Sequence, residues 1–279
     1  MERIHKGLEA LDRSQQLTGK AQSMELRILG AHNCETREAR LTSMLLDGII
    51  AIDVGGLTSS LTLEDQEGIK AVLLTHHHFD HIRDLATLGM NRYNSGPVSV
   101  YSLESVLDVI SRYLLDGTLY PDFSSRPSPD KPSIRLCPIE PYKEVSIEGY
   151  AVRPLPVNHC VPAVGYHVTA PDGRSIFYTG DTGRNDTSLW KHVSADLLVT
   201  EVTVPDKYRD IAGETGHLTP QSLKQELLDF QKAGGSLPPV VIVHMSPHIE
   251  DDIRRELAQV TAELGADITP AHEGMRIAV

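Results

Sequence analysis

Short apolar runs recur along the chain and are separated by turn-forming residues. Four runs, at 25–29, 43–46, 49–53 and 71–75, are spaced as expected for a meander of strands. Similar runs predict further strands at 98–101, 145–157, 165–169, 175–179, 197–203, 240–243, 267–269 and 275–279. Apolar residues recur at helical spacing elsewhere and predict helices at 82–90, 103–115, 222–232 and 253–264.

Strands and helices occur in both halves of the chain in a similar order. This order predicts mixed sheets with helices packed on their outer faces, in one domain that covers residues 24–279. Residues 1–23 are mostly polar, lack the apolar stretch of a signal peptide, and are predicted to form a polar extension. The segment 116–132 contains four prolines and predicts a long loop, of the kind that often serves as a lid or binding loop.

Composition and charge narrow the classes of function. Of the 279 residues 40% are hydrophobic, which is enough for a core and excludes a disordered chain. No apolar run approaches the roughly 18 residues of a membrane span, so we expect no membrane association. The net charge of −12 argues against a long nucleic acid as partner, since phosphate contacts need clustered Lys and Arg. The three cysteines form no CxxC pair and favour a reduced, cytoplasmic location.

The strongest chemical signal is an HxHxDH segment directly after the run at 71–75, formed by His76, His78, Asp80 and His81. Imidazole and carboxylate groups are natural ligands of Zn²⁺ and similar divalent ions. A turn at the end of a strand can direct the first two histidines toward one metal and the last two residues toward a second. The alternative is a histidine cluster on the surface with no ligand.

Three residues downstream follow other predicted strands and strengthen the metal interpretation. They are His159, Asp181 and His244. Each alone would more often be structural, but three in series after HxHxDH indicate a common site. His272 is the rival to His244 as the last ligand.

In this order the seven residues resemble those of the metallo-β-lactamase superfamily, and the resemblance covers nearly all of residues 24–279. It implies an α/β fold, an αββα sandwich of two mixed sheets with helices on the outer faces and a two-metal site at one edge. It further implies that the first metal is held by His76, His78 and His159. The second metal would be held by Asp80, His81 and His244, and Asp181 would bridge both. The ions implied are two divalent metals, Zn²⁺ first, with Mn²⁺ or Fe²⁺ as alternatives.

A finer resemblance is to the class II cyclic-nucleotide phosphodiesterases. It rests on the segments 40–48, 50–55, 119–123, 156–162, 180–183, 200–205 and 216–220, of which the last, Gly-His-Leu-Thr-Pro, is the most specific. The segment around Thr203 departs from the family, where it is more aromatic. Ribonuclease Z is the nearest competitor, with Glu201 and His217 at its matching positions, but the chain has no basic arm to hold tRNA.

The resemblance and the residues together predict a dinuclear metal-dependent hydrolase. We expect a phosphodiesterase that acts on cyclic nucleotides or similar small phosphodiesters through a metal-bridging hydroxide. His217 is the expected general acid, oriented by Glu201, and Asp80 would also orient the attacking water. In the alternative, His217 only precedes a helix capped by Thr219, and Glu201 is a structural or surface carboxylate.

Other functions remain open from sequence alone. The same scaffold could hydrolyse lactam, thioester or carboxyl ester bonds, could act as a ribonuclease Z-like tRNA 3′ endonuclease, or could bind metal without turnover. A homodimer would be unsurprising, but no pattern encodes it.

Several further residues receive specific expectations. Asp53 is expected to support the metal ligands by hydrogen bonds. His32 lies in an early loop that could border the site, and His77 is expected to point away from the metals. The remaining expectations concern packing and binding, with Trp190 and Tyr178 in the core, Cys160 as a buried filler, and Tyr120 and Phe123 as candidates for contacting a nucleobase.

Overall fold

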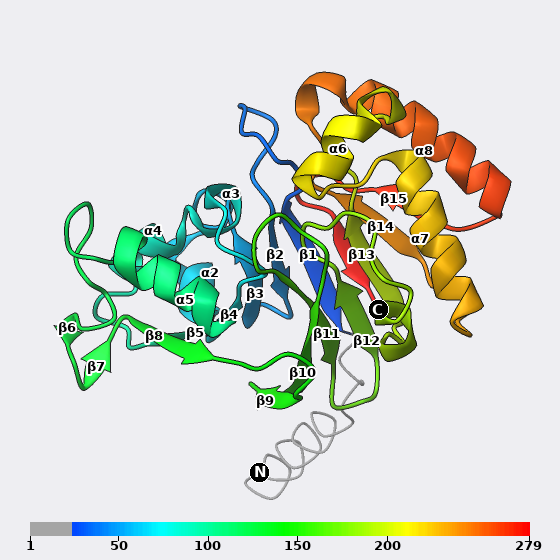
Figure 1. The fold of residues 1–279 in the computed structure, drawn as a ribbon. Helices are drawn as coiled ribbons and strands as arrows, with labels where there is room; N and C mark the ends of the chain where they lie inside the picture. Colours follow the sequence, from blue (N-terminus) through cyan, green and yellow to red (C-terminus); the bar gives the residue numbers. More distant parts are fainter. Residues whose placement is uncertain (1–23) are drawn as a thin grey trace, which may run out of the picture.

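Two seven-stranded sheets pack against each other and helices cover their outer faces (Figure 1). The computed structural model describes residues 24–279, so the predicted extension at 1–23 lies outside the described residues. The arrangement confirms the α/β fold class, an αββα sandwich of two mixed sheets. No helix within residues 24–279 is long and apolar enough to cross a membrane.

The first sheet has the strand order β16-β1-β2-β3-β4-β5-β8. Its strands are β1 (Glu25–Gly30), β2 (Ser43–Leu46), β3 (Ile50–Val54), β4 (Ala71–Leu73), β5 (Val98–Ser102), β8 (Ile134–Pro138) and β16 (Arg276–Ala278). Strands β1 to β3 are antiparallel, but β4 is parallel to β3, so the predicted meander is wrong at its fourth strand. The reason is helix α2 (Leu63–Gly68), which begins at a capping box on Thr62 and carries the chain back for a parallel pairing.

The second sheet has the order β15-β14-β13-β12-β11-β10-β9. Its strands are β9 (Val145–Ile147), β10 (Tyr150–Pro156), β11 (Val164–Thr169), β12 (Ser175–Tyr178), β13 (Leu197–Glu201), β14 (Val240–Val243) and β15 (Ile268–Pro270). The run at 145–157 is therefore a hairpin and not one strand. Glu148 and Gly149 both have positive φ in its two-residue turn, a conformation typical of tight hairpins.

Helices flank the two sheets on opposite sides of the molecule. The α-helices beyond α2 are α3 (Phe79–Ile82), α4 (Leu85–Asn91), α5 (Glu104–Val109), α6 (Arg209–Thr215), α7 (Pro220–Lys232) and α8 (Glu250–Leu264). Short 3₁₀ or π turns are η1 (Thr58–Ser60), η2 (Ile110–Leu114), η3 (Leu189–His192), η4 (Asp206–Tyr208) and η5 (Pro247–Ile249). The loop at 116–132 carries a small ribbon of β6 (Pro127–Ser128) and β7 (Lys131–Pro132). The segments predicted at 222–232 and 253–264 are confirmed as helices, each with a few more residues at its N-terminus.

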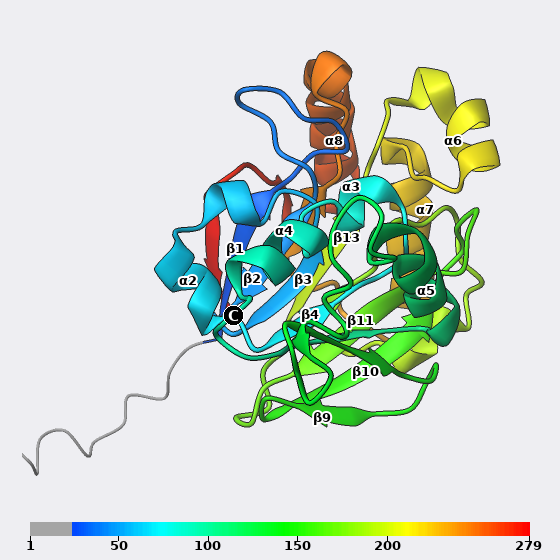
Figure 2. The ribbon, with the colours of Figure 1, turned by 90° about the vertical axis from the view of Figure 1, so that its left-hand side faces the viewer.

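Three apolar layers hold the sandwich together. The central layer lies between the sheets and includes Ile52 from the first and Val199 from the second. One outer layer joins the first sheet to α4 and α5, and the other joins the second sheet to α7 and α8, as the two views together show (Figures 1 and 2). Because side chains on both faces of each sheet are buried, the sheets form a rigid platform for the loops at their edge.

Both sheets contain parallel strands whose carboxyl ends lead into polar loops. In the first sheet β3 and β4 are parallel, and in the second sheet β12, β13 and β14 are parallel. The residues at or just beyond these ends are Asp53, His76, Asp181, Glu201 and His244. The packing of the two sheets brings them to one edge of the sandwich.

Candidate metal centre

Seven histidine and aspartate side chains meet in two adjoining clusters at this edge. The ligand atoms within each cluster lie within 4.8 Å of one another. One cluster consists of His76, His78, His159 and Asp181, and the other of Asp80, His81, Asp181 and His244. Every residue that the sequence predicted as a ligand is present, and Asp181 belongs to both clusters.

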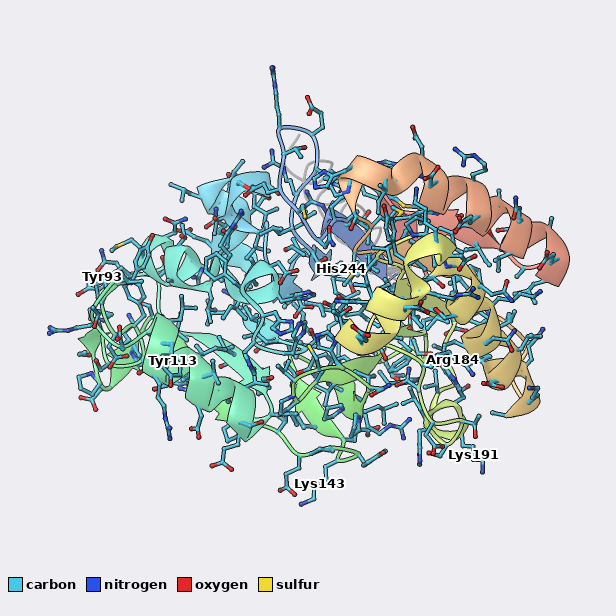
Figure 3. The ribbon with its side chains drawn as sticks, turned by 45° about the horizontal axis from the view of Figure 1, so that its top comes forward. Tyr93, Tyr113, Lys143, Arg184, Lys191 and His244 are labelled. Atoms are coloured by element: carbon cyan, nitrogen blue, oxygen red, sulfur yellow. The ribbon has the colours of Figure 1, made fainter. Side chains whose placement is uncertain are left out.

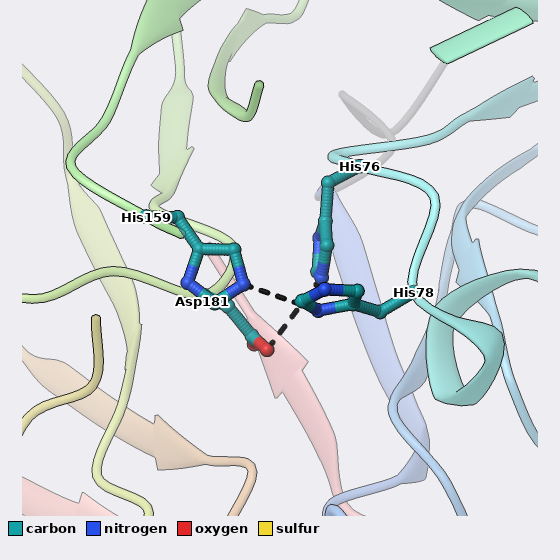
Figure 4. Close-up of side chains that lie close together, drawn as sticks. All are labelled: His76, His78, His159 and Asp181. Atoms are coloured by element: carbon teal, nitrogen blue, oxygen red, sulfur yellow. Dashed lines mark hydrogen bonds and ion pairs between the residues drawn. The ribbon is translucent and has the colours of Figure 1, made fainter. Parts of the chain in front are cut away.

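The first cluster combines the β4–α3 loop with two loops of the second sheet. Figure 4 shows His76 and His78 facing His159, with the Asp181 carboxylate beside them. His159 Nε2 lies 3.2 Å from His78 Nδ1, and His76 Nε2 lies 3.7 Å from Asp181 Oδ2. The rings of His76 and His159 are edge to face, with centroids 4.8 Å apart.

The second cluster joins α3 to the ends of β12 and β14. The Oδ2 atom of Asp181 lies 3.2 Å from His81 Nε2 and 3.3 Å from His244 Nε2. Asp80 Oδ2 lies 3.2 Å from His244 Nε2 on the more open side of the cluster. Figure 3 labels His244 between the two helical layers of the molecule. The imidazole nitrogens of this cluster thus lie close to the carboxylate oxygens of Asp80 and Asp181.

Buried atoms without hydrogen bonds show that the clusters suit cations. Nε2 of His76, Nε2 of His81 and Oδ1 of Asp181 are all buried and have no hydrogen-bond partner among residues 24–279. Leaving such polar atoms unpaired is costly unless a ligand satisfies them. Five imidazoles and two carboxylates form a donor set that suits Zn²⁺, Mn²⁺ or Fe²⁺.

Buried carboxyl and hydroxyl groups hold His76 and His81 by their Nδ1 atoms. His81 Nδ1 donates to Asp53 Oδ2 at 2.8 Å, and Tyr178 donates to the same oxygen at 3.2 Å. The Thr75 hydroxyl donates to Asp53 Oδ2 at 2.9 Å and can accept from His76 Nδ1 at 3.0 Å. These contacts leave Nε2 of both rings free for a metal, which is the usual role of the partner behind a metal-binding histidine.

Hydrogen bonds to Nδ1 also hold His244 and His159, on the other side of the site. His244 Nδ1 lies 2.8 Å from the Thr203 hydroxyl, which itself donates to Glu201 Oε2 at 2.6 Å. His159 Nδ1 donates to the backbone oxygen of Gly216 at 2.9 Å. Each ring again presents Nε2 to the clusters. The expected supporting role of Asp53 thus has a counterpart in Glu201.

Two site residues have left-handed backbone conformations. Asp53 has φ +51° and His244 has φ +63°, although neither is glycine. Residues of this kind are held in place by their surroundings at a cost of about 1–3 kcal/mol each, and they concentrate at functional sites. Here the rigid β3 and β14 strands and the hydrogen bonds of the two side chains supply that constraint.

His217 lies beside the clusters and is fixed by a buried carboxylate. Its Nδ1 donates to Glu201 Oε1 at 2.7 Å, while its ring stacks on His244 with centroids 5.3 Å apart. Glu201 is fully buried and also accepts from the backbone N–H of Thr182 at 3.0 Å. It is therefore not a surface carboxylate. Thr219 does cap α7, as expected if His217 only precedes a capped helix. The cap and the hydrogen bond between His217 and Glu201 are therefore both present.

The electrostatics of the site separate its acids and bases. Burial opposes charge on His217, but the charge and hydrogen bond of Glu201 outweigh it and raise the pKa of His217 to about 9. Burial similarly opposes charge on Asp80, yet the hydrogen bond and charge of the neighbouring histidines lower its pKa to about 2. Burial lowers the pKa of His76 well below its usual range. The site thus contains a protonated His217, an ionised Asp80 and a neutral His76.

Some residues lie away from the clusters. His32 contacts Glu273 and Glu250, and His272 is exposed with Nδ1 near the Glu273 backbone oxygen, so His244 and not His272 joins the site. His77 belongs to neither cluster, as expected. Trp190 and Tyr178 are buried, which confirms their place in the core.

Two expectations are wrong. Phe123 is fully buried between α4 and the first sheet, because the proline-rich loop folds back onto Gly89, and it cannot contact a nucleobase. Tyr120 lies instead in a separate hollow formed by that loop. Cys160 is exposed and not a buried filler. Its Sγ lies 3.7 Å from His159 Nε2 and 3.9 Å from His78 Nε2, because the loop after β10 turns it toward the mouth of the site.

The hydroxyls of Thr75 and Thr203 were missed by the sequence analysis. Both sit one or two residues from a predicted site residue, Thr75 before His76 and Thr203 after Glu201. Their position next to predicted site residues could have indicated a role. Threonine is common in strands, however, and the side chains that these hydroxyls contact lie far away in the chain.

Comparisons with known proteins agree with this geometry. Residues 51–245 match the family model of the "Beta-lactamase superfamily domain". The chain is 29% identical over 188 residues to an octanoyltransferase of Porphyromonas gingivalis, covering 65% of this chain and 33% of that protein. It is 25% identical over 194 residues to 3',5'-cyclic-nucleotide phosphodiesterase 1 of Saccharomyces cerevisiae, covering 68% of this chain and 51% of that protein.

A third relative and a solved structure extend the comparison. A ribonuclease Z of Bradyrhizobium diazoefficiens is 25% identical over 270 residues, covering 76% of this chain and 85% of that protein. The crystal structure of unliganded yeast PDE1 has a TM-score of 0.79 at 20% identity, over 92% of this chain and 99% of that chain. That likeness shows a common fold. The matched sequence spans only a third to a half of the first two relatives.

Proposed function

Since the chain belongs to the β-lactamase superfamily and carries the histidine and aspartate clusters of a hydrolase, we propose that it is a metal-dependent phosphodiesterase. Its substrates would be cyclic nucleotides or similar small phosphodiesters. The observation that carries the proposal is the hydrogen bond between His217 and Glu201 beside two clusters that share Asp181, which supports His217 as a proton donor. The similarity to a yeast cyclic-nucleotide phosphodiesterase supports the substrate class.

The proposed ligand assignment follows the two clusters. His76, His78 and His159 would hold one divalent ion, Asp80, His81 and His244 the second, and Asp181 would contact both. Bound there, two ions would supply Lewis-acid activation of water and would neutralise charge on the phosphate oxygens.

The chain's own residues divide the proton transfers between them. Asp80 is the more exposed cluster carboxylate, and with its lowered pKa it stays ionised and can accept a hydrogen bond from the attacking water. The proton that this water loses as its oxygen bonds to phosphorus passes to solvent, and solvent returns a proton to His217 after the leaving group has departed. His217 gives its Nε2 proton to the leaving alkoxide as the P–O bond breaks, since its Nδ1 is held by Glu201. The raised pKa of His217 keeps this proton in place at neutral pH.

The first experiment measures metal content and turnover together. Metal per chain is determined in wild type, in Asp181→Asn, and in Asp186→Asn as a matched control on an exposed carboxylate of the same loop. Turnover is measured on 2′,3′- and 3′,5′-cyclic AMP and on bis-p-nitrophenyl phosphate, with a β-lactam, an aryl ester and a precursor tRNA in parallel.

We expect two metal ions per chain and diester hydrolysis that falls at least about a hundredfold in Asp181→Asn but not in Asp186→Asn. Ester or lactam cleavage without diester turnover would overturn the substrate class. Cleavage of the precursor tRNA alone would favour a ribonuclease Z activity. A wild-type protein that binds no metal would contradict the ligand assignment itself.

A further inference from the structure

A cavity of about 200 Å³ lies next to His217 and is not used by the chemistry described above. It is bounded by α6, by the start of α7 and by the loops that carry His159 and Asp181. Its lining includes Asn158, Gly183, Arg184, Arg209, His217 and Ser222. A second hollow of about 300 Å³ shares Arg184, Arg209 and Ser222 with it, so the two adjoin and lead outward from the site.

The position of the cavity places it on the leaving-group side of the reaction. Asn158 directly precedes the ligand His159, and Gly183 follows the shared ligand Asp181 by two residues. The backbone N–H of Gly183 donates to the Asn158 oxygen at 2.7 Å, which closes this wall. Since His217 would protonate the departing oxygen and also lines the cavity, the group attached to that oxygen would enter this space.

The two arginines of the cavity have different surroundings. Arg184 Nη1 pairs with Glu226 Oε1 at 2.7 Å, and its Nη2 pairs with Asp229 Oδ2 at 2.7 Å, so two carboxylates compensate its charge. Arg209 has no hydrogen bond or ion pair to any side chain within residues 24–279, although the chain carries a net charge of −12. Its positive charge is therefore available to a ligand.

A short helix and the turn after it connect Arg209 to His217. Arg209 begins α6, which ends at Thr215, and Gly216 follows with a φ of +76° that turns the chain so that the His217 N–H donates to the backbone oxygen of Ala212 at 2.8 Å. Six residue steps of α-helix separate Arg209 from Thr215, roughly 9 Å along the axis. The cavity volume of about 200 Å³ suits a small group such as one ring.

We propose that this cavity is a subsite for an anionic group carried by the leaving alcohol, with Arg209 as the residue that recognises it. The preferred substrates are then phosphodiesters whose leaving alcohol bears a carboxylate or a second phosphate. This inference rests on the proposed phosphodiesterase function, which it makes more specific. Asp206 lines the outer hollow and disfavours a second anion further out.

The test uses two chromogenic diesters that differ by one carboxylate on the leaving phenol, methyl 4-nitrophenyl phosphate and methyl 3-carboxy-4-nitrophenyl phosphate. We expect Arg209→Gln to lower kcat/KM for the carboxylated diester about tenfold and to change the neutral one less than twofold. Arg209→Lys should recover part of the loss. Lys207→Gln removes the same charge two residues away, where Nζ pairs with Asp252, and should change neither substrate.

Equal effects of Arg209→Gln on both diesters, or no effect on either, would overturn the subsite. Binding separates this failure from failure of the proposed function. If the metal-loaded protein hydrolyses neither diester, the phosphodiesterase proposal fails, and calorimetric titration with the two uncleaved diesters still decides the subsite. Tighter binding of the carboxylated diester that disappears in Arg209→Gln would support it, and equal affinities would refute it.

Discussion

At the scale of single residues, hydrogen bonds to Nδ1 hold five imidazoles of the site, those of His76, His81, His159, His217 and His244. Asp53 and Glu201 are buried carboxylates that reach several histidines directly or through a threonine hydroxyl. Because Nδ1 of these rings is occupied, Nε2 is the atom left to bind a metal or to donate a proton. His217 differs from His76 in its pKa, which the charge and hydrogen bond of Glu201 raise.

A proton donor at His217 predicts a dependence on the leaving group. His217→Gln should lower kcat for 2′,3′-cyclic AMP by about 10²–10³, because an alkoxide needs a proton as it leaves. The loss for bis-p-nitrophenyl phosphate should be below about tenfold, since nitrophenolate is a good leaving group. The measurement is kcat on both substrates.

Thr219→Ala provides the control for a purely structural role of this turn. Loss of the α7 cap should lower the free energy of unfolding by about 1 kcal/mol. Any loss of kcat in Thr219→Ala should be the same for 2′,3′-cyclic AMP and for bis-p-nitrophenyl phosphate. Equal losses on both substrates in His217→Gln would contradict the general-acid role.

The exposed thiol of Cys160 makes the site sensitive to alkylation. Its Sγ lies within 4 Å of Nε2 of both His159 and His78, so a carbamidomethyl group there would crowd the first cluster. Treatment with iodoacetamide should abolish both diester turnover and binding of one metal ion, and Cys160→Ser should resist. Mass spectrometry identifies the labelled cysteine. Full activity of protein labelled at Cys160 would be the opposing result.

At the scale of elements, close backbone contacts hold the HxHxDH loop against the first sheet. A Cβ on Gly55, just beyond β3, would lie 1.8 Å from the Asp80 backbone oxygen and 2.9 Å from that of Thr42. Neither contact can be relieved by rotating a side chain. The placement of Asp80 and His81 therefore depends on a glycine at the end of a neighbouring strand.

Gly55→Ala should consequently disturb the second cluster. We expect a stoichiometry near one metal per chain in place of two, together with a free energy of unfolding lower by several kcal/mol. Gly213→Ala is the matched control, because a Cβ there meets nothing within 4 Å and alanine favours the helix. Metal analysis and urea unfolding test both variants. Unchanged metal content in a folded Gly55→Ala protein would refute this coupling.

At the scale of the whole molecule, His32 connects the two halves of the sandwich. Its Nδ1 lies 2.7 Å from Glu273 Oε1 and its Nε2 lies 3.1 Å from Glu250 Oε2 on α8. Its backbone bridges Leu41 on one side and Met245 on the other. Burial opposes its charge, but the two glutamates outweigh burial and raise the pKa of His32 above its usual range.

This raised pKa predicts how stability depends on pH. A group with a higher pKa in the folded state stabilises fully below its unfolded pKa, about 6.5, and less as the pH rises through the folded value. His32→Gln should therefore be less stable than wild type by about 2 kcal/mol at pH 6, and the difference should shrink toward pH 9. Urea unfolding at both pH values measures it. The exposed His272→Gln serves as control, and a difference that is constant with pH would contradict the ion-pair role.

Local sequence patterns predicted most helices and strands correctly. They failed where contacts between residues far apart in the chain determine the structure. The runs that became β1, β2 and β14 are read correctly because strand periodicity is a property of neighbouring residues. The exposure of Phe123 and the burial of Cys160 were predicted incorrectly, because both depend on how a loop folds over other elements. The parallel pairing of β4 was missed for the same reason, since α2 precedes it with little apolar periodicity.

The sequence by itself determined the fold class and the set of candidate ligands, because the spacing in HxHxDH and the residues that follow each strand are local features. Tertiary structure alone decided the partners of each imidazole, since Asp53 reaches Tyr178 and Thr203 reaches His244 across 125 and 41 positions of the chain. It also placed Arg209 beside His217 in a cavity and turned Cys160 outward. Packing of two rigid sheets brings these residues together, and no spacing along the chain encodes the resulting contacts.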